Sequence, residues 1–353
     1  MRRRFGLVAA LAIVVAACVG CDPGWVNPVL GSGDGSGSVP GDPPGVAVAD
    51  VALGSPSSLL DLGARGFLVY DGDACMIVLV AKGHATRFAG TGTCGESGDG
   101  GPATSAQISM PIQPLGGGFE ADAAGDVYFV SSESAQIRRI DSATGVISTF
   151  VDGPDDVVGI SAEADGSVTF LGLGTTDDDA NPFGYHLGRV DPSGQVTTIA
   201  RYESATWTTG FARVGPDHYV TFTDENPPDQ LRVDFDHGEV RTSALAPLPA
   251  TFVAEDASPD GSIYGLTVDS DDASVAFAGN RIVRIDPDGS AGIIAGTGHP
   301  DPGTRRQLDT GADLDLSAYS VAMTRNGNLL IASGHTVYNL VDPAAAPAIL
   351  PAS

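Results

Sequence analysis

The stretch GTGTCGESGDGGPATSAQI, at residues 90–108, decides the fold of this 353-residue chain because part of it occurs twice. When the chain is aligned with itself so that residue 90 falls on residue 296, the Gly-Thr-Gly at residues 90–92 meets a second Gly-Thr-Gly at residues 296–298. A loop that recurs between short apolar runs is typical of repeat architectures. The recurrence therefore predicts a repeat fold, although it does not indicate any catalytic or binding function.

Two turn signatures recur along the rest of the chain. One is a glycine followed by an alternating apolar run, in the segments ARGFLVY, AAGDVYF, ADGSVTF, PDGSIYG and RNGNLLI, which begin at residues 64, 123, 164, 259 and 325, with a divergent copy at 215. The other is a hairpin glycine, at residues 83, 145, 194, 238 and 289. Tight hairpin loops need positive φ, which glycine adopts without steric cost. Each unit therefore has two hairpins, the size of one propeller blade.

No segment has a long helical period, so the spacing predicts an all-β fold over residues 46–353. The expected architecture is a six-bladed β-propeller of four-stranded antiparallel blades. The last unit lacks a clear final hairpin glycine, and its fourth strand is expected to come from residues 348–350 or from residues 46–53. Closure of the ring matters because an open sheet edge invites aggregation.

The units resemble NHL repeats, most clearly in AAGDVYFVSSESAQIRRIDSATGVISTFVDG at residues 123–153. The SGDGGPATSAQ core of the first loop is similar to inter-blade loops of secreted bacterial NHL-repeat proteins. The resemblance is specific over residues 85–153, fair around 263–298 and weak between 155 and 249. It implies a propeller, and some such propellers are lyases with histidines in the central channel. Because the six histidines here show no HxH or HExxH spacing, that enzymatic pattern does not transfer.

The N-terminus resembles a bacterial lipoprotein signal peptide at residues 1–17, with three arginines, a short apolar run and Val-Ala-Ala before Cys18. Cys18 is the expected lipidation site, with Cys21 as the competing site and an ordinary secretory signal as the alternative. Residues 18–45 are rich in glycine, serine, proline and aspartate, which predicts a flexible tether. The chain is thus expected at the bacterial cell envelope, outside the cytoplasm and anchored to the membrane by its lipid.

The composition excludes one class of partner. The chain has 44 acidic and 18 basic residues, for a formal charge of −26. Such a surface repels phosphate backbones and anionic lipid headgroups, so nucleic acid is not expected as a partner. The remaining candidates are an unidentified protein and a small molecule.

Cys75 and Cys94 are the cysteines within the expected propeller. If the strands flanking Gly83 form a hairpin, residue 75 faces residue 92, which makes Cys94 a diagonal neighbour. A disulfide between them is expected, and the alternatives are two free thiols or a pairing with Cys21. No CxxC pair accompanies them, so a zinc site is not expected.

The loop at residues 90–108 could also be a phosphate-binding site, because its backbone amides could donate hydrogen bonds to a phosphate. Its motif consists of Gly90, Gly92, Ser97, Gly98, Asp99, Gly100 and Gly101. Glu96 and Asp99 oppose an anion, so a structural connector between blades is the favoured interpretation. Acidic clusters at residues 177–179, 269–272 and 309–315 could supply oxygen ligands, so a structural calcium ion stays a possible cofactor. No other cofactor and no catalytic residue is predicted. Trp207 is expected to pack in the core.

Three functions follow from this reasoning. The first is a lipid-anchored binding or scaffold module, for a protein or a small ligand. The second is an extracellular hydrolase or lyase with a metal in the channel, which requires carboxylates or histidines from several blades to converge on the axis. The third is a structural envelope protein.

Overall fold

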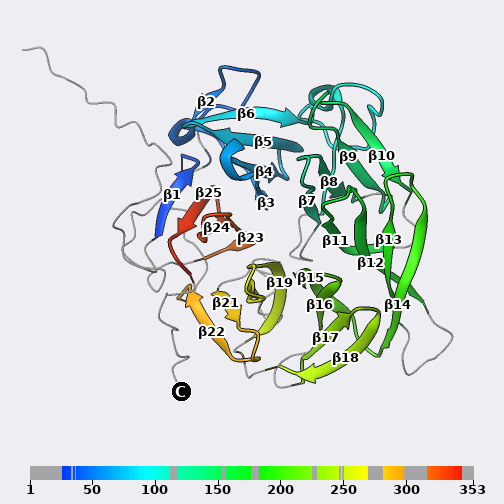
Figure 1. Cartoon of the computed structure of the whole chain (residues 1–353). Helices are drawn as coiled ribbons and strands as arrows, with labels where there is room; N and C mark the ends of the chain where they lie inside the picture. Colours follow the sequence, from blue (N-terminus) through cyan, green and yellow to red (C-terminus); the bar gives the residue numbers. More distant parts are fainter. Residues whose placement is uncertain are drawn as a thin grey trace, which may run out of the picture.

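The computed structural model describes residues 26–32, 35, 37–111, 118–132, 134–152, 156–175, 183–224, 229–245, 248, 250–268, 281–297 and 316–343. These residues form an all-β structure with three short 3-10 helices, η1 (Val48–Asp50), η2 (Gly63–Arg65) and η3 (Ala103–Ser105). Figure 1 shows small antiparallel sheets arranged around a central axis, as in a β-propeller. Within the described ranges, no helix is long and apolar enough to span a membrane.

The first two sheets come from the N-terminal half of the chain. One has the order β2-β6-β5-β4-β3, with β2 (Val46–Ala47), β3 (Pro56–Asp61), β4 (Phe67–Asp71), β5 (Met76–Ala81) and β6 (His84–Ala89). The next contains β7 (Phe119–Ala121), β8 (Val127–Val130), β9 (Ile137–Ile140) and β10 (Ile147–Val151). Apart from β2, which pairs with β6, the strands that follow one another in sequence within each sheet also pair, as expected for two hairpins per unit.

The middle of the chain continues this pattern. A four-stranded sheet contains β11 (Asp156–Ala162), β12 (Val168–Thr175), β13 (Phe183–Val190) and β14 (Val196–Ser204). An eight-stranded sheet contains β15 (Thr208–Gly215), β16 (His218–Thr223), β17 (Leu231–Asp236), β18 (Glu239–Ala244), β19 (Thr251–Ala257), β20 (Ile263–Val268), β21 (Arg281–Ile285) and β22 (Ala291–Ala295).

This large sheet consists of two antiparallel meanders, β15–β18 and β19–β22, joined by a parallel bridge between Gly210 and Ala254. Gly210 has φ +68°, and a Cβ at this position would collide with the backbone of Ala254. Glycine therefore allows two neighbouring inner strands to touch through their backbones.

The ring is closed by an N-terminal strand that was expected to belong to the flexible tether. β1 (Val26–Leu30) pairs antiparallel with β25 (Thr336–Leu340), which follows β23 (Ala318–Met323) and β24 (Leu329–Ser333) in the last sheet. Figure 1 shows β1 beside β25, so the two ends of the chain meet in one sheet. Val26 and Leu30 are fully buried there.

The expectation of a flexible tether over residues 18–45 is thus wrong for its strand-forming part. The backbone after β1 is also fixed, because Gly31 N–H donates to Val48 O over 2.9 Å and Ser38 N–H donates to Asp50 O over 2.8 Å. The expected closing strand at residues 46–53 is wrong as well, since Val46 and Ala47 pair with β6 at the outer edge of the first sheet. The other expected closing segment, residues 348–350, lies outside the described residues.

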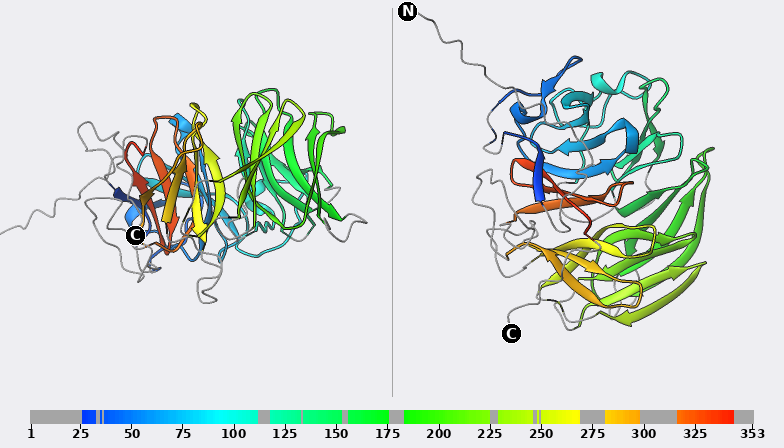
Figure 2. Two further views of the ribbon diagram at one scale, coloured as in Figure 1. Left: turned by 90° about the horizontal axis from the view of Figure 1, so that it is seen from below. Right: turned by 60° about the vertical axis from the view of Figure 1, so that its left-hand side comes forward.

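The core lies between neighbouring sheets, where apolar side chains from their facing surfaces interdigitate. One cluster joins the last sheet to the first through residues such as Leu30, Val69, Val78 and Leu330. The side view in Figure 2 shows how the sheets stand next to one another around the ring. The strands β3, β7, β11, β15, β19 and β23 contact one another in this order and surround the axis. Their polar side chains therefore decide what the centre of the ring can bind.

Candidate functional site

A cavity of about 220 Å³ lies between the inner strands. Residues of β3, β7, β11, β19 and β23 line it, including apolar side chains such as Val157 and Val321. A concave site at the centre of a rigid scaffold, apolar with a few polar groups, is the usual form of a small-molecule pocket. The cavity is therefore the candidate functional site.

Four carboxylates from three separate sheets line this cavity. Asp61 comes from β3, Glu120 from β7, and Glu255 and Asp256 from β19. This is the convergence of carboxylates on the axis that the hydrolase or lyase hypothesis requires. Among the described residues, however, no three acidic, histidine or cysteine side chains are placed to hold a metal ion together.

The pKa values of three of these carboxyl groups are raised. Burial raises the pKa of Asp256 to about 6, and the nearby Asp61 charge adds to this. Burial also raises the pKa of Glu120 well above its ordinary value, and the negative charges of Asp256 and Glu163 act in the same direction. Burial raises the pKa of Glu255 in the same way. Carboxyl groups whose pKa values are raised by burial and by neighbouring carboxylates are often found at functional sites.

Backbone amides hold these side chains in place. Met323 N–H and Ala257 N–H donate to the two oxygens of Asp256, each over 2.7 Å. Arg325 N–H donates to Asp61 Oδ2 over 2.9 Å. Because β23 supplies a donor to β19 and the turn after β23 supplies one to β3, the carboxylates of two sheets are oriented by the segment between them.

A second network extends from the ring of inner strands between β11 and the following meander. Glu163 is buried, with Arg213 Nη1 at 2.8 Å and Arg189 Nη2 at 3.6 Å from its carboxylate oxygens. Tyr219 donates a short hydrogen bond to Glu163, and burial together with this bond raises the pKa of Tyr219 to about 12. The paired Glu163 is thus a structural link between sheets, unlike the carboxylates of the cavity.

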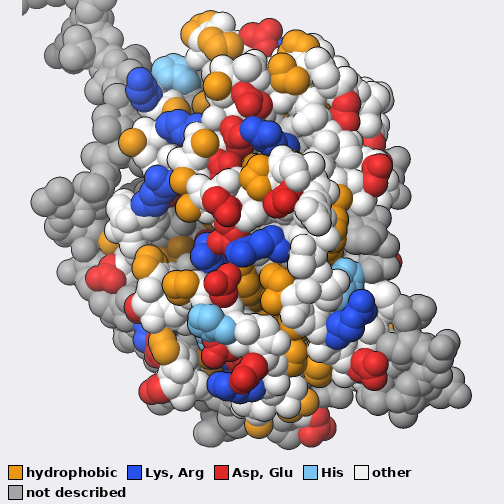
Figure 3. Space-filling model, turned by 45° about the vertical axis from the view of Figure 1, so that its right-hand side comes forward, with side chains coloured by type: hydrophobic (Ala, Val, Ile, Leu, Met, Phe, Trp, Pro, Cys, Tyr) orange, Lys and Arg blue, Asp and Glu red, His pale blue; other side chains and the backbone are white. Residues whose placement is uncertain are grey.

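Elsewhere on the surface, charges of both signs are mixed. Figure 3 shows acidic and basic side chains interspersed on one face of the molecule. Pairs such as Arg232–Asp234, with 2.7 Å between Nη2 and Oδ1, connect neighbouring positions on one strand. This face therefore presents no field of a single sign that would favour a charged macromolecule.

The predicted loop at residues 90–108 packs on the sheet formed by β7–β10. Arg138 has a fully buried side chain and donates to Gln107 O at 2.9 Å, to Ser97 O at 3.3 Å and to Asp99 Oδ1 at 2.6 Å. Thr149 donates to the other oxygen of Asp99 from both its backbone and its hydroxyl. Burial alone would raise the Asp99 pKa, but these hydrogen bonds lower it overall. Asp99 thus fills the place that an anion would need, in agreement with a connector.

The glycines of this loop take part through their backbone. Gly100 N–H donates to Ile147 O over 2.8 Å, and Ile147 N–H donates to Gly101 O over 3.0 Å. Gly90 N–H donates to Ala103 O over 3.0 Å within the loop itself. Gly90, Gly92 and Gly98 all have positive φ. The loop thus forms hydrogen bonds along β10 and connects the first sheet to the second.

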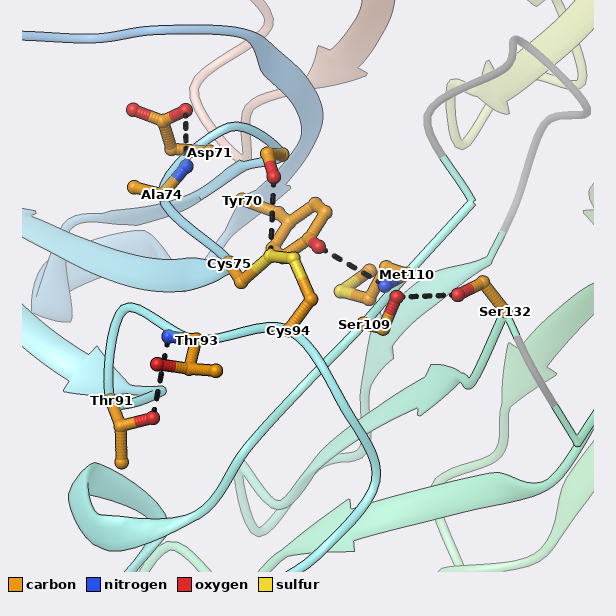
Figure 4. Close-up of a disulfide and its surroundings, with 11 residues drawn as sticks. Tyr70, Asp71, Ala74, Cys75, Thr91, Thr93, Cys94, Ser109, Met110 and Ser132 are labelled. Carbon is orange, nitrogen blue, oxygen red and sulfur yellow. Dashed lines mark hydrogen bonds between the residues drawn. A yellow bond between two sulfur atoms is a disulfide. The ribbon is translucent and has the colours of Figure 1, made fainter.

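The disulfide between Cys75 and Cys94 is confirmed, with a Cα–Cα distance of 5.1 Å. Figure 4 shows it joining the turn before β5 to the loop, near the hydrogen bond from Met110 N–H to the Tyr70 hydroxyl. The alternatives of free thiols and of a pairing with Cys21 are therefore excluded for these two residues. The bridge fixes the start of the loop to the first sheet, and Arg138 fixes its middle to the second.

Other candidate residues lie away from the cavity. His84, His218 and His237 are at or beside hairpin turns, as expected. The acidic clusters at 177–179, 269–272 and 309–315 lie outside the described residues, as do Cys18, Cys21 and the second Gly-Thr-Gly beyond residue 297. The expectation that Trp207 packs in the core is wrong: it is 52% exposed and contacts Phe183, with ring centroids 4.6 Å apart.

The carboxylates of the cavity were not predicted from the sequence. The available signal was a charge inside an apolar run, as in Gly-Phe-Glu-Ala at residues 118–121 and Val-Ala-Glu-Asp-Ala at residues 253–257. A charge at an inner-strand position of a propeller faces the axis, whereas at an outer-strand position it faces solvent. Only the assignment of strands to the inner ring separates the two cases.

The raised Asp256 pKa predicts an unusual pH dependence. Because Asp256 binds its proton more tightly in the folded chain, its ionisation opposes folding above about pH 6 and has no effect below about pH 4. We expect Asp256→Asn to raise the free energy of unfolding by about 1–2 kcal/mol at pH 7.5 and to leave it nearly unchanged at pH 4. Urea unfolding at both pH values measures this.

Asp141→Asn is the matched control for that experiment. Hydrogen bonds from the hydroxyl and the backbone of Thr144 lower the Asp141 pKa, so its ionisation favours folding. The Asn variant of this residue should therefore be less stable than the parent protein at pH 7.5. The two variants should thus change stability in opposite directions at pH 7.5. If both changed it in the same direction, a raised pKa of the buried Asp256 carboxyl would be contradicted.

Comparisons with known proteins support the fold. No family model matches the chain, and no curated protein matches it. A structural genomics protein of unknown function from Bacteroides thetaiotaomicron matches with a TM-score of 0.56 at 14% identity, over 89% of this chain and 74% of that chain. A streptogramin B lyase matches with a TM-score of 0.50 at 14% identity, over 89% and 96% of the two chains. A gluconolactonase from Xanthomonas campestris matches with a TM-score of 0.51 at 13% identity, over 81% and 86%. At such identities, these β-propeller proteins show a common fold and no common activity.

Proposed function

We propose that this chain is a lipid-anchored propeller of the bacterial cell envelope that binds a small ligand in its central channel. The carrying observation is the cavity into which carboxylates converge from three sheets, held by backbone amides. A purely structural role gives no reason to gather four partly buried carboxyl groups around one cavity. A scaffold for a large protein partner gives no reason either, because such a partner binds an outer surface.

The blade count belongs to the same proposal. We count the two meanders of the eight-stranded sheet as separate blades, because a single backbone bridge joins them. With this count, each of the strands β3, β7, β11, β15, β19 and β23 is the inner strand of one blade, and the ring has six. The NHL-like signature of residues 123–153 covers strands β8, β9 and β10 of the second blade, which supports an NHL-type propeller.

A thermal-shift screen of small metabolites tests the channel as the binding site. Ser58 is partly exposed in the cavity wall on β3, so we expect Ser58→Phe to fill the cavity and to abolish stabilisation by true ligands. Ser134→Phe, at an exposed position outside the cavity, is the control and should leave the shifts unchanged. A ligand set that stabilises both variants equally would place binding outside the channel.

A second candidate is a hydrolase or lyase that uses the carboxyl groups themselves. It is favoured by the raised pKa values of Glu120 and Asp256, which face one cavity from different sheets. One group could then donate a proton while the other accepts one. With a ligand from the screen as substrate, Asp256→Asn should abolish turnover and retain binding. Undiminished turnover in this variant would remove the candidate.

The anchor is tested by fractionation. We expect Cys18→Ala to move the protein from the membrane to the soluble fraction, because the thiol that carries the lipid is lost. Cys21→Ala is the matched control and should stay with the membrane. If the two variants exchanged these results, Cys21 would be the lipidated residue; if both stayed, the link would not be a lipid on either thiol.

A further inference from the structure

The outer edges of the sheets differ in whether another segment covers them. On the first sheet β2 pairs with β6, and on the last sheet β1 pairs with β25. On the second sheet the loop at residues 90–108 forms hydrogen bonds with β10 through Gly100 and Gly101. No described segment pairs with the outer edges of β14, β18 and β22. Such an edge presents unpaired N–H and C=O groups to which a strand of another chain can bind.

β14 offers a regular stretch of such an edge. It is the longest described strand, with nine residues, and Figure 1 shows it at the outer rim of the ring. Its pairing with β13 shifts register at Ile199, and a Cβ added at Gly238, in the turn between β17 and β18, would lie 3.7 Å from Ile199 O. The chain bends after Ser204. The regular and uncovered part of the edge is therefore residues 200–204, with Tyr202 at its middle.

The charges on this stretch are self-complementary. Arg201 and Glu203 flank Tyr202, are exposed, and form no side-chain ion pair or hydrogen bond with other described residues. If two copies pair antiparallel with Tyr202 opposite Tyr202, Arg201 of each copy lies opposite Glu203 of the other. Opposite charges at facing positions of an antiparallel pair stabilise it, and like charges destabilise it. Parallel pairing in the same register would place each charge opposite its own kind.

The remaining positions are compatible with this antiparallel pair. Ala200 of each copy would face Ser204 of the other, and both side chains are small and buried against their own sheet. The antiparallel direction also brings the end of β14 that carries Val196 beside the end of the second copy that leads to Trp207. Val196 is 40% and Trp207 is 52% exposed, and the only other exposed large apolar side chain among the described residues is Val39. The pair would thus bring together two apolar side chains that the single chain leaves in water.

The other two uncovered edges lack this pattern. On β18, Glu239 already pairs with Arg241 of the same strand, with 2.7 Å between Oε2 and Nη2. Arg241 lies at the middle of that strand, so an antiparallel pair of two copies would bring two arginines together. β22 has no charged residue that could specify a partner or a register.

We propose that two copies of this chain associate through β14, in an antiparallel pair whose two-fold axis passes at Tyr202. A two-fold contact uses the same surface on both copies and closes at a dimer. The pairing is short, so the dimer is weak and dissociates at the dilution of gel filtration. The contact lies at the rim of the ring, so it is independent of a ligand in the central cavity.

Sedimentation equilibrium of the full chain, with micelles in excess over protein and at concentrations up to about 0.2 mM, tests the association. We expect a monomer–dimer equilibrium. Arg201→Glu and Glu203→Arg should each weaken dimerisation by about tenfold, because the two-fold axis places two like-charge pairs in the contact. The double variant restores opposite charges and should regain the affinity of the parent protein. Arg241→Glu, at an exposed position on β18, is the control and should dimerise like the parent protein.

Cysteine trapping tests the register of the pair. Tyr202→Cys puts a thiol from each copy on the proposed axis, where facing Cα atoms are close enough for a disulfide. In a chain that also carries Cys21→Ala, oxidation with copper phenanthroline should link two copies through this position. Thr198→Cys, exposed on the same strand but away from the axis, is the control and should not cross-link.

Several results would overturn the inference. One is a chain that stays monomeric at the highest concentration. Another is a dimer that both single charge reversals leave unchanged, or that the double variant does not regain, since the contact would then lie on another surface. Cross-linking through Thr198→Cys in place of Tyr202→Cys would contradict the register, and a series of higher oligomers would contradict two-fold closure. All of these results leave ligand binding in the central cavity unaffected, so the proposed function is tested separately.

Discussion

A chain shortened to begin at Ser32 should lose about 5 kcal/mol of its free energy of unfolding, because it lacks β1. Val26 and Leu30 are fully buried and Val29 is 6% exposed, and each such side chain contributes about 1.5–3 kcal/mol through burial. The loss is comparable with the whole stability of an ordinary domain. It also leaves β25 as an unpaired edge strand, which should promote association of the shortened chain. Urea unfolding and light scattering after gel filtration measure the two effects.

A chain that begins at Gly24 is the matched control, because it lacks the signal peptide and retains β1. It should unfold like the chain that begins at Cys18 and stay monomeric. A second control, Val39→Ala, removes a side chain that is 61% exposed and should change stability by less than about 0.5 kcal/mol. Equal stability of the two shortened chains would mean that residues 26–31 are a tether after all.

The position of β1 shows what sequence reasoning could not provide. Val-Asn-Pro-Val-Leu at residues 26–30 lies between segments rich in glycine, serine and proline, and its composition is that of a linker. The strand forms because β25 offers an unpaired edge more than 300 residues later, with Val26 opposite Leu340 and Leu30 opposite Val337. A pairing between the two ends of a chain leaves no local signal in the sequence. The hairpin glycines mark local turns, so those turns could be predicted.

In the candidate site too, some features depend on local sequence and others on contacts between distant parts of the chain. The Cys75–Cys94 bridge joins positions beside a single hairpin, so neighbouring residues were enough to predict it. The register behind the prediction was wrong, because Ala81 pairs with His84 and a bulge interrupts the pairing next to Val78, which does not place residue 75 opposite residue 92.

Glu120 and Asp256 lie on different sheets and meet only through the closure of the ring. Their raised pKa values depend on burial by the whole propeller, which no single repeat determines. Sequence spacing thus predicted the repeated unit and its loop, and the tertiary arrangement created the site.

Arg138→Met should lower the free energy of unfolding by about 3 kcal/mol, although it changes a residue that contacts neither the cavity nor the disulfide. Its guanidinium is fully buried and donates to Gln107 O, Ser97 O and Asp99 Oδ1, and these acceptors would lose a charged donor. Removal of one partner from a buried ion pair typically costs about 3–5 kcal/mol. The lower end is expected here because Asp99 is 43% exposed and keeps its hydrogen bonds from Thr149.

Arg241→Met is the control, because the Arg241 side chain is 65% exposed and its ion pair with Glu239 joins two surface groups. It should change stability by less than about 0.5 kcal/mol. Limited proteolysis should cut the Arg138→Met variant within residues 95–102, between the bridge at Cys94 and η3, because this part loses its attachment to β9. The Arg241→Met variant should resist such cleavage.

A double-mutant cycle identifies Asp99 as the partner of Arg138. Asp99→Asn alone leaves a buried guanidinium without its counter-charge, and Arg138→Met alone leaves a carboxylate without its cationic partner. The double variant removes both charges, so its loss should be smaller than the sum of the two single losses by about 1–2 kcal/mol. Strict additivity would contradict the ion pair. It would reopen the interpretation of the loop as an anion site, since Arg138 would then be a cation without a carboxylate to neutralise it.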